Sequence, residues 1–168
     1  FVNWRGMFEG GGRRIKTSVL IDQTSIRFLD EELLERLSKI HLLKDYLATK
    51  TEEIREYNIK HQIDDTSVVN GRHLTNLGTF RAYLVAYLRA HPQINQDLIM
   101  IVRQLPPTTN GLPMEIYAFT KDVGWVNHES VAADIFDHVL AIISEFDLRV
   151  FQNPSGNDLA RLVAERGL

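Results

Sequence analysis

The stretch MIVRQLPPTTNGLPMEIYAFT at residues 100–120 decides the fold of this chain. An apolar run at residues 98–105, with Arg103 and Gln104 as its polar members, predicts one strand. It ends at two consecutive prolines, which cannot donate to a β-ladder. The turn residues PPTTNG then lead into a second predicted strand at residues 113–120. We therefore expect an antiparallel hairpin with a loop of several residues.

The segments on either side of this hairpin supply two more predicted strands. RRIKTSVLI at residues 13–21 alternates with a period of two. The alternation places Ile15, Thr17 and Val19 on one face and the polar residues Arg14, Lys16 and Ser18 on the other. That alternation is typical of a half-buried strand. A short apolar run at residues 148–151 predicts the last strand, which turn-forming residues around Pro154 bring to an end.

The segment after the first strand predicts a capped helix over DEELLERLSKI, beginning at Asp30. The Asp30 carboxylate can accept from the free amides of the first turn, and Glu31 and Glu32 favour the positive end of the helix dipole. Leu33, Leu37 and Ile40 follow at helical spacing and form the stripe that we expect to be buried.

Three further stretches have helical patterns. Residues 42–60 predict a polar helix with few large apolar anchors, which we expect on the outside. Residues 76–91 carry apolar side chains on one side and stop before Pro92. Residues 127–146 have the widest apolar stripe, formed by Val131, Ile135, Val139, Ile142 and Phe146.

The element order predicts the fold class. It runs strand, helix, inserted helices, strand, strand, helix, strand, and without the inserted helices this is the ferredoxin-like split β-α-β-β-α-β pattern. We therefore expect an α+β fold with a four-stranded antiparallel sheet, both helices on one face, and an inserted helical segment.

Composition excludes several classes of protein. With 168 residues, 44% of them hydrophobic and 24% charged, the chain has the size and balance of one folded domain. A net charge of -3 argues against nucleic acid as a partner, and the absence of cysteine excludes disulfides, thiolate zinc sites and thiol nucleophiles. No run of 18 apolar residues occurs, and the opening FVNWRGMFEGGG lacks the pattern of a secretory signal. We interpret the chain as a piece of a longer protein.

The run EGGGRRIKTS at residues 9–18 invites comparison with a phosphate-binding loop, because Lys16 and Thr17 follow a glycine cluster. A P-loop needs the glycines between a strand and a helix, with a glycine directly before the lysine. Here the glycines precede a strand, and Ile15 occupies the place of the last glycine. The pattern favours a joint between two domains.

Asp134, Asp137 and His138 are spaced so that their side chains share one side of the predicted helix at residues 127–146. Such a trio could hold a divalent cation, but no fourth ligand follows at a recognisable spacing. The spacing favours a solvated polar face opposite the apolar stripe. The other histidines, at positions 41, 61, 73, 91 and 128, form no recognisable constellation.

Other catalytic patterns are missing from the sequence. It has no serine in a strand-to-helix elbow and no paired carboxylates at strand ends. Acylphosphatase-type chemistry would need an arginine in a phosphate loop after the first strand, where Arg27 is the candidate and no glycine accompanies it. We therefore expect no enzymatic activity and no catalytic, cofactor-binding or metal-binding residue.

Four stretches carry a resemblance to a known family: NWRGMFEGGGRRIKTSVLIDQTSIRFLDEE at residues 3–32, NGRHLTNLGTFRAYLVAYLRAHP at 70–92, MIVRQLPPTTNGLPMEIYAFT at 100–120 and ADIFDHVLAIISEFDLRVFQNPSG at 133–156. In this order, over nearly the whole chain, they resemble the cytoplasmic C-terminal part of miniconductance mechanosensitive channels. These channels are a branch of the small-conductance mechanosensitive channel family.

The resemblance implies a domain organisation. Residues 1–12 would comprise the end of a preceding β domain and a glycine joint. Residues 13–152 would form the α+β domain of a cytoplasmic vestibule. Relative to the plain small-conductance pattern, residues 41–92 would be a helical insertion. The tail at residues 153–168 would be a turn and a short helix, where other members have a strand of a terminal barrel.

The resemblance also implies a function. The parent protein would be a homo-oligomeric channel, a heptamer in the family, in the bacterial inner membrane. It would open under membrane tension in hypoosmotic shock and pass ions and small solutes. This segment would lie on the cytoplasmic side, support assembly and form the ion-access cage, and contact the membrane only through helices outside it. The alternative is a free-standing ferredoxin-like module that binds a ligand or regulates a partner.

Overall fold

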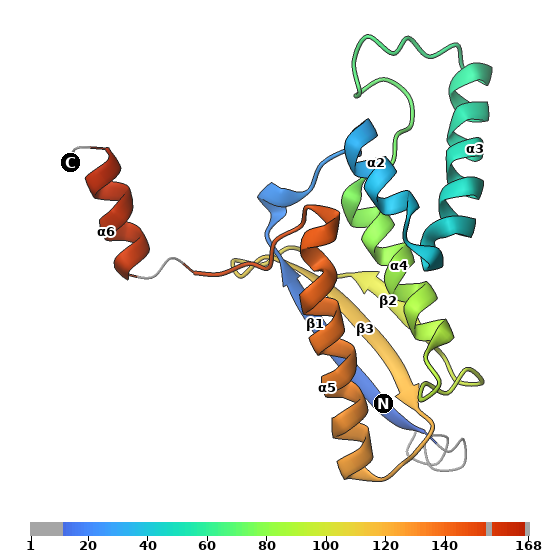
Figure 1. Ribbon diagram of the computed structural model, residues 1–168, viewed down its shortest axis with the longest axis vertical. Coiled ribbons are helices and arrows are strands. Elements are labelled where there is room, and N and C mark those ends of the chain that lie inside the picture. Colours follow the sequence, from blue (N-terminus) through green and yellow to red (C-terminus); the bar gives the residue numbers. More distant parts are fainter. Residues whose placement is uncertain (1–11, 154–155, 167–168) are drawn as a thin grey trace.

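The structure is a computed structural model that describes residues 12–153 and 156–166. It has an α+β fold built on a three-stranded antiparallel sheet of order β1-β3-β2 (Figure 1). The strands are β1 (Arg13–Ile21), β2 (Ile101–Gln104) and β3 (Leu112–Thr120). Strand β1 has the predicted bounds, whereas the predicted glycine joint and end of a β domain at residues 1–12 lie, except for Gly12, outside the described residues.

The predicted hairpin is confirmed. Strands β2 and β3 pair antiparallel, with Arg103 opposite Glu115. Gly111, just before β3, has a φ of +101°, a value that favours glycine. Strand β1 pairs along the other edge of β3, where Ile15 lies opposite Ala118 and both are buried. One face of the sheet therefore carries the apolar residues that the alternation predicted.

Strand β2 is shorter than the predicted strand at residues 98–105. The chain does pair with the end of β3 earlier, because Ile94 forms an isolated bridge with Thr120. It then leaves the sheet through a turn in which the Asp97 amide donates to Asn95 Oδ1 at 2.9 Å. Pairing resumes only at Ile101 because this side-chain hydrogen bond offers the backbone an alternative to the ladder.

The predicted fourth strand at residues 148–151 is reduced to a single bridge, between Val150 and Ile21 at the end of β1. Its hydrogen bonds are Asp22 N–H to Arg149 O at 2.8 Å and Phe151 N–H to Leu20 O at 2.9 Å. An ion pair between Arg149 and Asp22, 3.2 Å apart, supports it. Four full strands are therefore not confirmed in the described residues, because the pairing stops at this bridge although β1 continues back to Arg13.

The helices lie close to their predicted positions, with 3₁₀ turns (η) between them. They are η1 (Gln23–Ser25), α2 (Glu31–Ser38), η2 (His41–Leu43), α3 (Lys44–Lys60), α4 (Asn76–Ala90), α5 (Trp125–Ile142), η3 (Ile143–Phe146) and α6 (Gly156–Glu165). The predicted cap is confirmed, because the Leu33 amide donates to Asp30 Oδ1 at 2.8 Å. Helix α4 stops before Pro92 as predicted, and its own cap is Thr75, whose Oγ1 accepts from Gly78 N–H at 3.0 Å.

Helix α4 takes the place on the sheet that the element order gave to the helix beginning at Asp30. It packs against β2, while α5 packs against β1, and both lie in front of the sheet in Figure 1. Helix α2 packs instead against η2 and η3. The reason is its length, because eight residues supply only Leu33 and Leu37 as fully buried side chains, whereas α4 buries five apolar ones.

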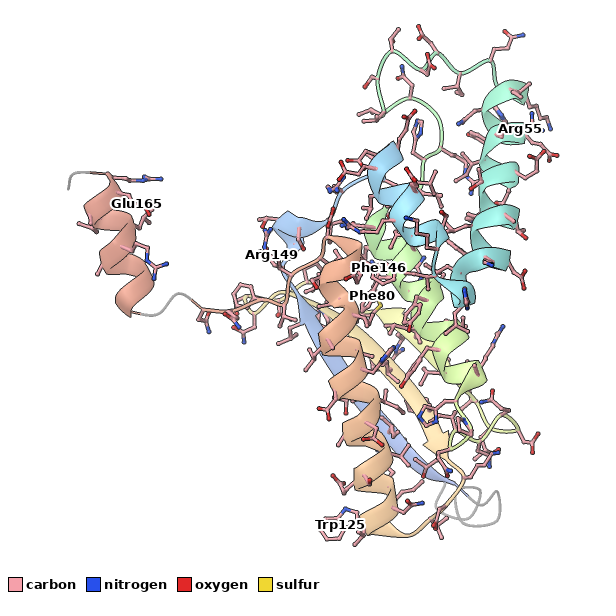
Figure 2. The ribbon with its side chains drawn as sticks, in the orientation of Figure 1. Arg55, Phe80, Trp125, Phe146, Arg149 and Glu165 are labelled. Atoms are coloured by element: carbon pink, nitrogen blue, oxygen red, sulfur yellow. The ribbon has the colours of Figure 1, made fainter. Side chains whose placement is uncertain are left out.

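The core lies between the sheet and helices α4 and α5, and it joins the helices to each other. Figure 2 shows Phe80 of α4 and Phe146 of η3 close together, with ring centroids 5.3 Å apart in an edge-to-face arrangement. Both are almost fully buried. Such aromatic pairs add to the stabilisation from burial alone, so this contact fixes the end of α5 against α4.

Candidate functional site

A cluster of tyrosine and histidine side chains joins helices α4 and α5. Tyr83, Tyr87 and His91 lie four residues apart and therefore share one side of α4 and its C-terminal end. His138 of α5 meets them: its Nε2 is 2.6 Å from the Tyr83 hydroxyl oxygen, and its ring stacks on Tyr87 with centroids 4.4 Å apart. The His91 ring contacts the Tyr87 ring edge-on, with ring centroids 5.7 Å apart.

The surroundings of this cluster favour uncharged side chains. Burial raises the pKa of Tyr83 and of Tyr87, and the Asp134 carboxylate raises the pKa of Tyr87 further. Burial also lowers the pKa of His91, against the opposing effect of Asp134. Both tyrosines therefore keep their protons at neutral pH. The Tyr83 hydroxyl can donate to His138 Nε2 when that nitrogen is unprotonated, and accept from it when it is protonated.

Asp134, Asp137 and His138, the three residues considered as metal ligands, therefore do not share one set of contacts. His138 turns to Tyr83, while Asp134 and Asp137 are exposed on α5. Within residues 12–153 and 156–166, no three histidine, cysteine, aspartate or glutamate side chains gather closely enough to hold a metal ion. The arrangement is a contact between two helices, with the carboxylates on the solvent side.

Arg27, the candidate for a phosphate loop, is occupied by carboxylates. It donates to Asp30 at 3.1 Å and to Asp147, whose other oxygen accepts from Arg36 at 2.6 Å. Arg36 also donates to the Glu145 carbonyl at 2.9 Å. Partial burial opposes ionisation of Asp147, but the hydrogen bonds from the two arginines outweigh it and lower the pKa of this carboxyl. These ion pairs fasten the segment before α2 and the last turn of α2 to Asp147 at the end of η3.

Asn76 lies beneath this network and was not singled out from the sequence. It is fully buried in the first turn of α4, where its Nδ2 donates to Ser25 O at 2.9 Å and to Phe146 O at 3.1 Å. Its Oδ1 accepts from Arg27 N–H at 2.9 Å. One amide group therefore joins three segments of the chain. An asparagine directly after the cap residue Thr75 is the only sequence signal that could have drawn attention to it.

The glycine and lysine pattern at the start of the chain does not form a phosphate loop in the described residues. Lys16 and Thr17 lie within β1 and are exposed. Gly12 is tightly packed, because a Cβ placed there would lie 2.6 Å from Thr120 O. This close approach to β3 explains a glycine directly before the strand.

No family model matches the chain. Among the helices in the described part of the chain, none has the length and apolar character that crossing a membrane requires. The contacts within this chain therefore indicate the role of the site residues described above. Each of Arg27, Asp147, Asn76, Tyr83 and His138 binds another part of the same chain, so together they hold elements in place.

Proposed function

We propose that this chain is the cytoplasmic domain of a subunit of a mechanosensitive ion channel of the small-conductance family. In this role it supports assembly of a homo-oligomer, a heptamer in the family, and forms part of the cage through which ions and small solutes reach the pore. The observation that carries the proposal is the resemblance of the four stretches quoted above, in the same order over nearly the whole chain.

The finer fold that goes with this function is the ferredoxin-like split β-α-β-β-α-β arrangement. Helices α4 and α5 would be its two helices, and residues 148–151 its fourth strand beside β1. This assignment is supported by the strand order β1-β3-β2 and by the bridge of Val150 to the free edge of β1. The full oligomer would extend this short pairing if a neighbouring subunit held the segment in place.

A structural rather than enzymatic role is supported by how the polar residues are used. Arg27 is paired with Asp30 and Asp147, and His138 is bonded to Tyr83. Each of these groups stabilises the domain instead of presenting a free reactive atom to a substrate. We therefore propose no catalysis, no cofactor and no metal for this chain.

Location and permeation follow from the same proposal. The parent protein would be in the bacterial inner membrane with this segment on the cytoplasmic side, and it would touch the bilayer only through helices outside the segment. Charges at the openings of the cage would influence passing ions within about 10 Å, the Debye length at ordinary salt. The net charge of -3 gives no support to nucleic acid as a partner.

Electrophysiology of the parent protein tests the proposal. We expect tension-gated currents when the full-length protein is reconstituted into lipid patches and suction is applied, with none in patches of lipid alone. Absence of current from correctly folded, membrane-inserted protein would refute it. Tight binding of a small molecule to an isolated, monomeric chain, measured by calorimetry, would instead support the ligand-binding module.

A further inference from the structure

Helix α6 has an apolar side that its own domain does not cover. Leu162 and Val163 are 45% and 44% exposed, and every described side chain at residues 160–166 is exposed. The sequence places Leu162 and Val163 on one side of the helix and Arg161 and Glu165 on the other. A ten-residue helix of this kind is marginal in water alone, and packing of its apolar side would stabilise it.

A groove that could receive such a helix lies between the start of α3 and the second half of α4. Its volume is about 630 Å³, and Ala82, Val85 and Ala86 of α4 form one wall. Leu42 and Tyr46 form the other wall, and Leu42 is 37% exposed. The groove continues along α3 into a second hollow that shares Tyr46 and reaches Lys50.

The groove and α6 agree in length and chemistry. Residues 82–90 of α4 line the groove over eight residue steps, about 12 Å at 1.5 Å per residue, and α6 with ten residues is about 15 Å long. The small alanines of the wall leave room for leucine and valine side chains. Asp45 and Arg89 both line the groove. Glu165, the last residue of α6, and Arg166, directly after it, carry the charges opposite to these two.

The position of α6 in the fold favours docking on another copy. Figure 1 shows α6 on one side of the domain and helices α3 and α4 on the opposite side, with α5 and the sheet between them. The Phe151 amide is bonded to Leu20 O, so only residues 152–155 connect the sheet to α6. Five residue steps extend at most about 18 Å, which limits how far α6 can move from the edge of β1.

We propose that α6 of one copy docks into the groove between α3 and α4 of a second copy of this chain. The proposal rests on the proposed homo-oligomeric role and names the contact through which neighbouring copies are joined at their C-terminal ends. Because one helix buries little surface, the contact would be weak between two isolated domains and stronger where other parts of the oligomer already hold the copies together.

Disulfide trapping tests this contact, and the chain suits it because it has no cysteine. Copies carrying Val163→Cys are mixed with copies carrying Ala86→Cys and oxidised with copper phenanthroline. We expect a disulfide-linked dimer that contains one copy of each variant, identified by mass. A mixture of Val163→Cys with Val126→Cys is the matched control, because Val126 is 82% exposed on α5 and lies outside the groove.

Two further variants link the trapping to the apolar contact. Leu162→Asp, added to the Val163→Cys copy, is expected to lower the yield of mixed dimer by about tenfold, because burial of one leucine strengthens association by at least that factor. Arg161→Gln, on the polar side of the same helix, is expected to leave the yield unchanged. Circular dichroism of each variant checks that the domain is folded.

Three outcomes would overturn the proposal. A dimer of Val163→Cys copies alone, in higher yield than the mixed dimer, would show that α6 pairs with itself. A link formed only within a chain carrying both substitutions would show docking on its own domain. A yield no higher than the Val126→Cys control would show no docking. If the parent protein gave tension-gated current but its Val163→Cys and Ala86→Cys copies formed no mixed disulfide, this contact would be rejected and the channel proposal would remain.

Discussion

Replacing Asn76 with alanine would remove three hydrogen bonds from the centre of the fold. The Ser25 and Phe146 carbonyls would lose a donor and the Arg27 amide would lose an acceptor, and Asn76 is fully buried. The partners would be left with unsatisfied polar atoms, each of which costs about 1–3 kcal/mol when water cannot reach it. Arg27 is exposed and its amide can regain water, whereas Ser25 and Phe146 are buried, so we expect a total loss of about 3 kcal/mol.

Chemical and thermal unfolding measure this loss. In a domain of this size about 3 kcal/mol corresponds to a decrease in Tm of about 6–12 °C. Urea titration followed by circular dichroism would give the change in free energy of unfolding, provided that the slope with denaturant is unchanged. Asn70→Ala is the matched control, because its side chain makes an exposed hydrogen bond to Asp64 O in a loop, and we expect a loss below about 0.5 kcal/mol.

The same reasoning makes a second variant informative. Asn76→Asp keeps an oxygen that can accept from Arg27 N–H, but it places a carboxylate beside two carbonyl oxygens and removes the donor. We expect it to be at least as destabilising as Asn76→Ala at neutral pH and to recover partly in acid, where the carboxyl can donate. A loss below about 0.5 kcal/mol for Asn76→Ala would refute the claim that this side chain holds the three segments together.

Three further predictions concern other contacts. Tyr83→Phe removes the hydroxyl bonded to His138 and should reduce the free energy of unfolding by about 1 kcal/mol in urea titrations, and an unchanged midpoint would show that the stack on Tyr87 suffices. The lowered pKa of Asp147 predicts stability that is present above the ordinary aspartate value of 3.8 and is lost as the pH falls below it. Asp147→Asn should flatten this acid part of a Tm-against-pH curve, and an unaltered curve would assign it to other carboxyls. Gly111→Ala should lower the stability by about 1–3 kcal/mol, because φ is +101° and the new Cβ would lie 2.8 Å from Ile21 O, and a wild-type Tm would contradict this.

The sequence by itself determined the elements whose causes lie within a few residues. The alternation at residues 13–21 gave β1 its bounds, and the apolar run, prolines and turn residues around residue 106 gave the hairpin. The side chain of Asp30 predicted the cap of α2, and the missing backbone N–H of Pro92 predicted the end of α4. These effects are local, because periodicity, capping and proline geometry depend only on neighbouring residues.

Only the tertiary structure decided which segments meet. Asn76 contacts Arg27 and Phe146, which are 49 and 70 residues away, and Tyr83 meets His138 across 55 residues. The choice of α4 rather than α2 for the sheet, and the reduction of the fourth strand to one bridge at Val150, depend likewise on how the helices fill the space above the sheet. Hydrophobic burial is non-directional, so the apolar periodicity of a sequence predicts only that one face of a helix or strand will be covered. Which segment covers that face depends on the close packing of particular side chains.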